Sequence, residues 1–284
     1  MKGYLDELNE QQRQAVEHTD GPSLIIAGAG SGKTRVLTTR IVHLISQGID
    51  AFNILALTFT NKAAKEMRKR IEEMVGTDAK NIWMGTFHSV FARLLRSEAA
   101  KLGYPVNFTI YDTEDSKSLI RTILKEEQLD SKLYNASFVY NRISGLKNNL
   151  ITPKQYLNDE EYISEDLANG RPKFGEIYLK YTSRCFKSGA MDFDDLLLKT
   201  HILLENFPEA LNKYQHQFKH VLIDEFQDTN RVQYLIVKRI AAATRNLSVV
   251  GDDSQSIYSF RGANIKNILH FEKDYPELKV FKLE

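Results

Sequence analysis

A glycine-rich segment near the N-terminus has the residue types of a phosphate-binding loop. It lies between an apolar run at 23–27 and a segment whose apolar residues recur at helical spacing. Glycines let successive backbone N–H groups point at phosphate oxygens, and the start of a helix adds positive potential. Incidental glycine-rich turns share this composition, but the strand before it and the helix after it favour a nucleotide site. The residues expected around the phosphates are Ala27, Gly28, Ala29, Gly30, Ser31, Gly32, Lys33 and Thr34.

Two side chains of this loop suit particular parts of a bound nucleotide. Lys33 is expected to reach the β- and γ-phosphates, and the Thr34 hydroxyl is expected to hold Mg²⁺. The first position is Ala27, whereas the general pattern G-x-x-x-x-G-K-[ST] begins with glycine. ATP and Mg²⁺ are therefore the expected cofactors.

A second chemical signal is a pair of carboxylates at the end of an apolar run. The run 220–223 is followed directly by Asp224 and Glu225. Ligands of parallel sheets bind at the carboxyl ends of the strands, so both residues should fall near the phosphate loop. Asp224 is placed to position Mg²⁺, and Glu225 to orient or deprotonate the water that attacks the γ-phosphate. An isolated acidic pair is more often a solvated surface feature, but its place beside a phosphate loop favours the catalytic interpretation.

The elements that must position these residues alternate between strand and helix. Strand-like runs at 23–27, 54–58 and 82–85 alternate with helical patterns, and the same rhythm resumes after Met191 with strands at 220–223, 247–250 and 279–283. This alternation predicts an α/β fold with a parallel sheet and helical crossovers. Because the last strand ends the chain, we expect a fragment of a longer protein.

Strand signals vanish from about residue 111 to residue 190. Three helical segments, 113–127, 138–149 and 174–187, fill this region. A stretch of this length is too long for a loop within a sheet domain. We therefore predict a discontinuous P-loop domain from 1–110 and 191–284, with 111–190 as an inserted helical subdomain.

Composition excludes several other classes of protein. The chain has 284 residues, 42% of them hydrophobic and 26% charged, which is typical of a folded globular protein. Its net charge is +1, so any nucleic-acid site must be local. The single cysteine, Cys185, excludes a disulfide framework and favours a cytoplasmic setting. No apolar run approaches the ~18 residues of a membrane helix, so no membrane partner is expected.

Six motifs, in this order, closely resemble those of superfamily 1 DNA helicases of the UvrD/PcrA/Rep group. They span essentially the whole chain, and alanine at the position of Ala27 is itself usual in this family. The motifs are L-N-E-Q-Q (8–12), T-F-T-N-K-A-A (58–64), G-T-F-H-S (85–89), M-D-F-D-D-L (191–196), D-E-F-Q-D-T (224–229) and G-D-D-S-Q-S-I-Y-S-F-R-G-A (251–263). The resemblance implies a RecA-like P-loop parallel sheet flanked by helices, with an inserted all-helical subdomain.

The resemblance also assigns roles at the nucleotide. It implies that Gln12 hydrogen-bonds the adenine and that Arg35 lies beside the nucleotide. It further implies that Gln255 touches the γ-phosphate and links it to the DNA side. The catalytic set expected from the residues and the resemblance together is Lys33, Glu225 and Gln255.

For the DNA, the resemblance implies aromatic stacking faces beside a few polar groups. Aromatic rings accept any base, as movement that ignores sequence requires. Alternatives stay open for several of these residues: Phe59 and Phe193 suit a plain core, His88 suits a structural histidine, and the basic run 62–70 suits a solvated helix face. Family members often carry tryptophan where this chain has Phe260. The expected nucleic-acid residues are Phe59, Asn61, His88, Phe193, Tyr258, Phe260 and Arg261.

The function implied is an ATP-dependent DNA helicase or translocase moving 3′ to 5′, with single-stranded DNA and single/double-strand junctions as partners. Repair or replication proteins are further expected partners. Three other interpretations remain: the motor of a recombination-type helicase–nuclease, a nucleic-acid-binding or regulatory module with a silent nucleotide site, and a P-loop kinase, which is the weakest because nothing after Gly251 offers an acceptor pocket. The family's completing arginines lie beyond Glu284, and an arginine finger contributes about 10³–10⁵ in rate. We therefore expect the isolated chain to bind nucleotide weakly and to hydrolyse it slowly or not at all.

Overall fold

The computed structural model describes residues 3–28, 30–252 and 264–283. The chain forms two compact units. The first unit combines residues 1–90 with 208–284, and the second comprises 91–207.

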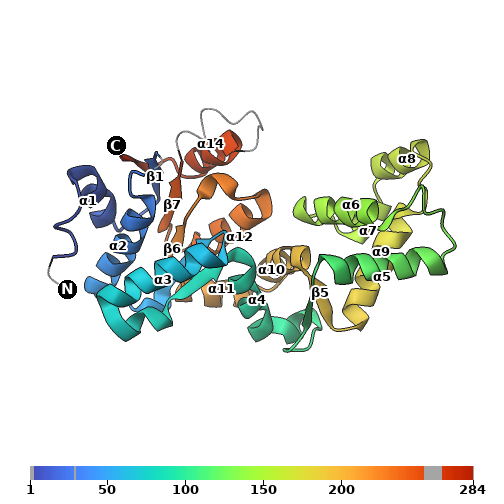
Figure 1. Ribbon diagram of the computed structural model, residues 1–284, viewed down its shortest axis with the longest axis horizontal. Helices are drawn as coiled ribbons and strands as arrows, with labels where there is room; N and C mark the ends of the chain where they lie inside the picture. Colours follow the sequence, from blue (N-terminus) through green and yellow to red (C-terminus); the bar gives the residue numbers. More distant parts are fainter. Residues whose placement is uncertain (1–2, 29, 253–263, 284) are drawn as a thin grey trace. The chain divides into compact units, whose positions relative to one another are not determined.

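The first unit is built on a six-stranded sheet in which every pair of neighbouring strands is parallel. The strand order is β3-β2-β6-β7-β1-β8, so the ends of β6, β7 and β1 lie next to one another (Figure 1). The strands are β1 (Ser23–Ala27), β2 (Ile54–Thr58), β3 (Trp83–Thr86), β6 (His220–Ile223), β7 (Leu247–Gly251) and β8 (Lys279–Leu283).

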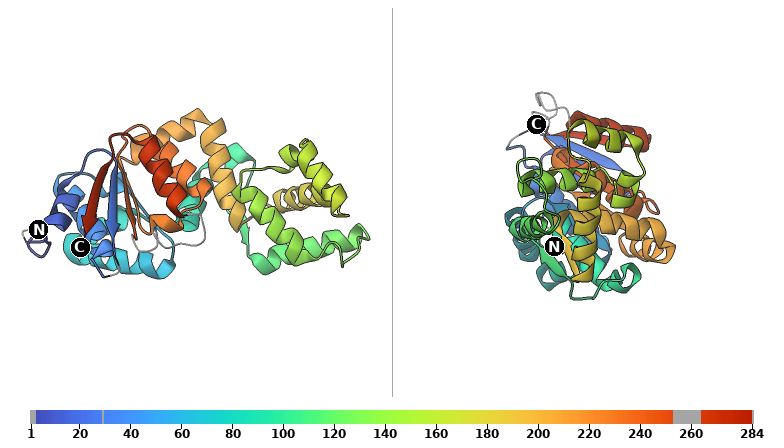
Figure 2. Two further views of the ribbon diagram at one scale, coloured as in Figure 1. Left: turned by 90° about the horizontal axis from the view of Figure 1, so that it is seen from above. Right: turned by 90° about the vertical axis from the view of Figure 1, so that its right-hand side faces the viewer.

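Helices cover both faces of this sheet. Figure 2 shows α1 to α3 on one face and α12 and α14 on the other. Alternate strand residues such as Ile25, Ala56 and Leu222 pack with α1, α2 and α3 in one apolar core. The inner strands β2, β6 and β7 are buried at every position, as strands covered on both faces should be, whereas the edge strand β8 carries Lys279 and Lys282 and is mostly exposed. The helices are α1 (Glu10–Glu17), α2 (Lys33–Ser46), α3 (Asn61–Val75), α11 (Pro208–Gln217), α12 (Arg231–Ala241) and α14 (Asn264–Asp274), with short 3₁₀ turns η1 (Ala51–Asn53), η2 (Gly76–Asn81) and η4 (Phe226–Asp228).

The second unit is mainly helical. Its core gathers aromatic and branched side chains, among them Ile143, Phe174, Tyr178 and Tyr181. Two three-residue strands, β4 (Thr109–Tyr111) and β5 (Ala190–Asp192), pair in parallel. The helices are α5 (Thr113–Glu126), α6 (Ala136–Asn148), α7 (Pro153–Leu157), α8 (Glu160–Ala168), α9 (Phe174–Lys187) and α10 (Phe193–Asn206); α4 (Phe87–Glu98) spans the boundary between the units and is followed by η3 (Ala99–Leu102).

The predicted α/β fold with a parallel sheet is confirmed. The strands at 23–27, 54–58, 220–223 and 279–283 have the predicted bounds. Seven of the described α-helices and β-strands were not predicted from the sequence: β4, β5, α1, α7, α8, α11 and α14. The proposed domain boundaries at 110/111 and 190/191 fall within β4 and β5, inside the second compact unit, and remain a prediction. In the described ranges, no helix has the length and apolar character needed to cross a membrane.

Candidate active site

The loop between β1 and α2 has the backbone that its glycines predict. Gly30 and Gly32 both have left-handed φ values, +83° and +88°. At Gly32 an added Cβ would also lie 2.9 Å from the Gln12 amide nitrogen, so a side chain there would collide as well as strain the backbone. The Ser31 hydroxyl donates to the Gly28 carbonyl at 2.7 Å and closes the turn. Ala29 lies outside the described residues.

Gln12 connects this loop to α1. Its side chain is buried, and Nε2 donates to the Ser31 carbonyl at 2.9 Å. Its Oε1 accepts from the Asn9 backbone N–H at 3.1 Å, which completes the capping box of α1. Each end of the amide therefore already makes one bond within the chain. The contact of Gln12 with adenine stays a prediction that must use the remaining hydrogen or lone pair.

The acidic pair lies where β6 ends. The Asp224 N–H donates to the Leu57 carbonyl at 2.9 Å, which continues the pairing with β2. Asp224 is buried, and this burial, reinforced by the charge of Glu225, raises the pKa of Asp224 to about 6. Glu225 has a left-handed φ of 50°, rare for a residue with a side chain.

Lys33 brings the loop and the acidic residues together. Its Nζ lies 3.9 Å from Glu225 Oε2 and 2.7 Å from Asp252 Oδ2. The three residues follow β1, β6 and β7, which are adjacent in the sheet. The expected proximity of Lys33 and Glu225 is therefore present in the structure.

Two members of this cluster had no role assigned from the sequence. Asp252 pairs with Lys33, and the side chain of Gln227 donates to Glu225 Oε2 at 2.5 Å. Both residues lie inside the motifs at 224–229 and 251–263, so the motifs themselves carried the signal.

The donor set fits a magnesium ion. Mg²⁺ prefers hard oxygen ligands and usually takes one or two from protein, with waters and phosphate oxygens completing the octahedron. One oxygen of Asp224, Oδ1, accepts the Glu225 N–H at 3.0 Å, which leaves Oδ2 for such an ion. Within the described ranges no cluster of three or more His, Cys, Asp or Glu could hold a metal ion by itself. Thr34 and Asp224 remain the proposed magnesium ligands.

The predicted nucleic-acid residues have different surroundings. Phe59 is half-buried and packs against the core residue Phe87, with ring centroids 5.3 Å apart. Asn61 is exposed at the start of α3, and His88 is half-buried on α4. Phe193, in the second unit, is 45% exposed at the first position of α10. Gln255, Tyr258, Phe260 and Arg261 lie outside the described residues.

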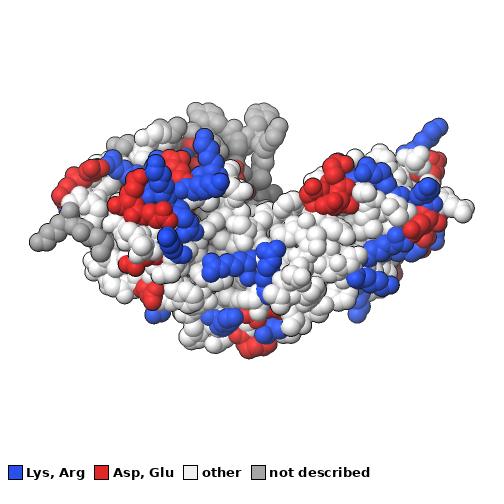
Figure 3. Space-filling model, turned by 60° about the horizontal axis from the view of Figure 1, so that its bottom comes forward, with Lys and Arg blue, Asp and Glu red and all other residues white. Residues whose placement is uncertain are grey.

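The residues of the basic run at 62–70 have different surroundings. Arg68 donates to the carbonyls of Ala79 and Met84, so it connects α3 to η2 and β3. Lys62 and Lys65 are exposed. On the face drawn in Figure 3, basic and acidic side chains of the described residues lie in the same regions of the surface.

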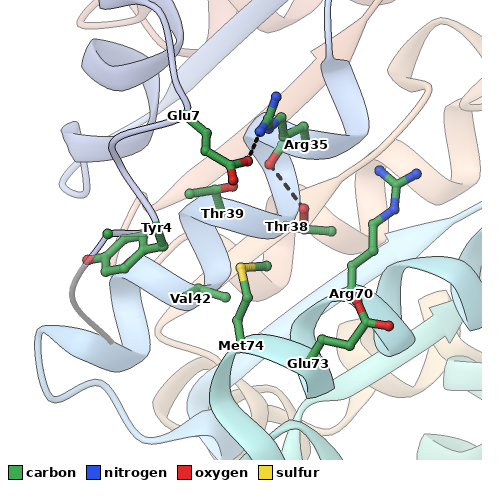
Figure 4. Close-up of a pocket in the computed structure, with 10 residues that line it drawn as sticks. Tyr4, Glu7, Arg35, Thr38, Thr39, Val42, Arg70, Glu73 and Met74 are labelled. Carbon is green, nitrogen blue, oxygen red and sulfur yellow. Dashed lines mark hydrogen bonds and ion pairs between the residues drawn. The ribbon is translucent and has the colours of Figure 1, made fainter.

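Arg35 lines a cavity of about 660 Å³ whose walls come from the N-terminal segment, α2 and α3 (Figure 4). Its guanidinium pairs with Glu7, and Arg70 and Met74 of α3 line the opposite side. Of the predicted nucleotide residues that the structure describes, only Arg35 lines this cavity. Its place beside a nucleotide stays a prediction.

Comparison with known proteins adds to this geometry. Residues 8–276 match the model of the UvrD/REP helicase N-terminal domain. The chain belongs to this family. That places the first unit among RecA-like domains, whose parallel sheet it has. Similar relatives include the ATP-dependent DNA helicases PcrA of Staphylococcus aureus (strain Mu50) and Staphylococcus epidermidis (strain ATCC 12228), each 47% identical over 286 residues. The match covers 100% of this chain and 38% of each relative, so the chain spans well under half of their length.

Proposed function

We propose that this chain is the ATP-binding part of an ATP-dependent DNA helicase, which couples ATP hydrolysis to movement along single-stranded DNA. Membership of the UvrD/REP family and the names of the PcrA relatives support this function. ATP and Mg²⁺ are the cofactors that we propose.

The observation that carries the proposal is the meeting of Lys33 with the carboxylates of Glu225 and Asp252 beside the glycine loop. In this proposal Lys33 binds the β- and γ-phosphates, while Thr34 and Asp224 hold Mg²⁺. The metal would offset negative charge on the phosphate oxygens. Glu225 orients the attacking water and takes its proton. Gln255 would contact the γ-phosphate.

The proposed nucleic-acid partner is single-stranded DNA, including its junctions with duplex. The exposure of Phe193 supports a stacking role, because a stacked base needs an accessible ring face. Asn61 at the start of α3 is accessible to a DNA backbone. Movement from 3′ to 5′ and contacts with repair or replication proteins belong to the same proposal and rest on the family resemblance.

The test uses the full-length protein with Lys33→Ala. We expect DNA-stimulated phosphate release and duplex unwinding to be lost, while Lys180→Ala, a change at an exposed ion pair with Glu127, leaves both intact. Unwinding that survives Lys33→Ala would refute the motor function. The isolated 284-residue chain, tested in parallel, should release phosphate far more slowly than the full-length protein.

A further inference from the structure

The side chain of Gln227 bridges two strand ends of the candidate active site. The residue is 2% exposed and lies in η4, just after β6. Its Nε2 donates to Glu225 Oε2 at 2.5 Å, and its Oε1 accepts from the Asp252 backbone N–H at 3.2 Å. A carboxylate can only accept and a backbone N–H can only donate, so these partners fix which way the amide faces.

This bridge leaves the two oxygens of Glu225 in different situations. Oε2 accepts from Gln227 and lies 3.9 Å from Lys33 Nζ. Within the described part of the chain, no donor contacts Oε1 of Glu225. The side chain is 38% exposed, so a water molecule can reach Oε1. Gln227 thus holds the carboxylate by one oxygen and leaves the other for the water.

The bridge also connects Glu225 to the partner of Lys33. The same Asp252 whose N–H is bound by Gln227 holds Lys33 through its carboxylate at 2.7 Å. A triphosphate that draws Lys33 away from Asp252 therefore disturbs Asp252. The Gln227 side chain connects Asp252 to Glu225, so the disturbance can reach Glu225. The Gln227 side chain is buried and each end of its amide makes a hydrogen bond, so it has few alternative arrangements and a shift at one end is passed on.

We propose that Gln227 is a positioning residue for ATP hydrolysis: it aligns Glu225 on the attacking water and ties this alignment to the Lys33–Asp252 pair. The proposal rests on the proposed function. It predicts that Gln227 affects the hydrolysis step, acts only through Glu225, and contributes little to nucleotide binding.

The test is a double-mutant cycle in the full-length protein with saturating single-stranded DNA. Gln227→Met keeps the length of the side chain and removes both hydrogen bonds. We expect kcat to fall by about 10- to 100-fold, because a small misplacement of a catalytic group has effects of this size. The KM for ATP should stay within about threefold, as for an interaction that matters only in the transition state. In a Glu225→Gln background, where single turnovers are measured, Gln227→Met should change the residual rate less than about twofold.

Gln233→Met is the matched control. Gln233 is also a buried glutamine, but it accepts from the Asn230 backbone N–H in the capping box of α12. The control should lower the melting temperature and leave kcat unchanged. If Gln227→Met fails to fold, Gln227→Glu replaces it in the same cycle, because it keeps an acceptor for Asp252.

The positioning role alone would be overturned if Gln227→Met lowered the rate equally with and without Glu225→Gln. It would also be overturned if Gln227→Met raised KM and left kcat unchanged. Absence of DNA-stimulated hydrolysis in the unsubstituted full-length protein would instead overturn the proposed function, and the inference with it. The two failures are therefore distinguishable.

Discussion

Lys33 Nζ and Asp252 Oδ2 lie 2.7 Å apart, and the two side chains are only 14% and 6% exposed. The cation that should bind phosphate is therefore already neutralised by a carboxylate of its own chain. A charge-assisted contact of this kind contributes about 1.5–3 kcal/mol. In the proposed nucleotide site, the phosphates therefore compete with Asp252 for Lys33.

Asp252→Asn should tighten ATP binding. The substitution removes the competing negative charge, and we expect the Kd to fall about fivefold, which corresponds to roughly 1 kcal/mol. Titration of the protein with a fluorescent ATP analogue measures the change. Glu209→Gln, at an exposed carboxylate of α11, makes the same charge change and should leave the Kd as it was. An unchanged or weaker affinity in Asp252→Asn would show that the pair does not compete with nucleotide.

Phe193→Ala should weaken binding of single-stranded DNA more than it lowers stability. The ring is 45% exposed, so its removal uncovers only part of a buried side chain, whereas loss of one stacked base costs about 1–3 kcal/mol. The affinity is measured by fluorescence anisotropy, in which full-length protein is titrated into labelled single-stranded oligonucleotides. Phe52→Ala removes a comparably exposed ring from the first unit and serves as control. Equal affinities for all three proteins would remove Phe193 from the DNA site.

Lys147→Met should destabilise the second unit strongly. Lys147 is buried, and its Nζ lies 2.6 Å from Asp192 and 2.9 Å from Asp195. Burial alone would lower the pKa of Lys147, but the charges of Asp195 and Asp192 outweigh it and raise the pKa. Removing this cation leaves two buried carboxylates without the positive charge that both contact, although Tyr181 and backbone N–H groups still donate to them, and we expect a loss of about 3–5 kcal/mol.

Denaturant unfolding, followed by circular dichroism, measures the effect of Lys147→Met. The matched change Lys180→Met breaks an exposed pair with Glu127 and should cost less than about 1 kcal/mol. Similar losses in both variants would mean that the buried pair contributes no more than a surface one.

Stability should fall as the pH drops from 6.5 towards 4, because of His220. Burial, and then the positive charge of Arg40, lowers the pKa of His220 from 6.5 to about 4, although Asp20 opposes the shift. The folded chain therefore keeps His220 neutral, while the unfolded chain takes up a proton near pH 6.5. Above pH 6.5, protonation of His220 does not affect the free energy of unfolding. Near pH 4, it has lowered this free energy by on the order of 3 kcal/mol.

His220→Gln should flatten this part of the pH profile, measured as the free energy of unfolding at each pH. His216→Gln, at an exposed histidine of α11, should leave the slope as it is. An unaltered slope in His220→Gln would assign the acid sensitivity to other groups.

The sequence predicted those features whose cause is local. The loop at 27–34 and the apolar run before Asp224 can be recognised from their residue types. The backbone geometry of the loop and the burial of the strand each depend on a few consecutive residues. The three-residue strands β4 and β5 are too short to show a period, so they were missed. The contacts of Asp252 and Gln227 depend on the adjacency of β6, β7 and β1, which no local pattern encodes.

Glu225 occupies a backbone conformation that glycine would adopt at less cost. Substitution by glycine would ease folding here but would delete the proposed water-activating carboxylate. The side chain is thus retained at a position where stability alone favours its loss. Selection for thermal robustness and selection for turnover therefore pull in opposite directions at this position, and stabilised variants of the protein should be sought elsewhere in the chain.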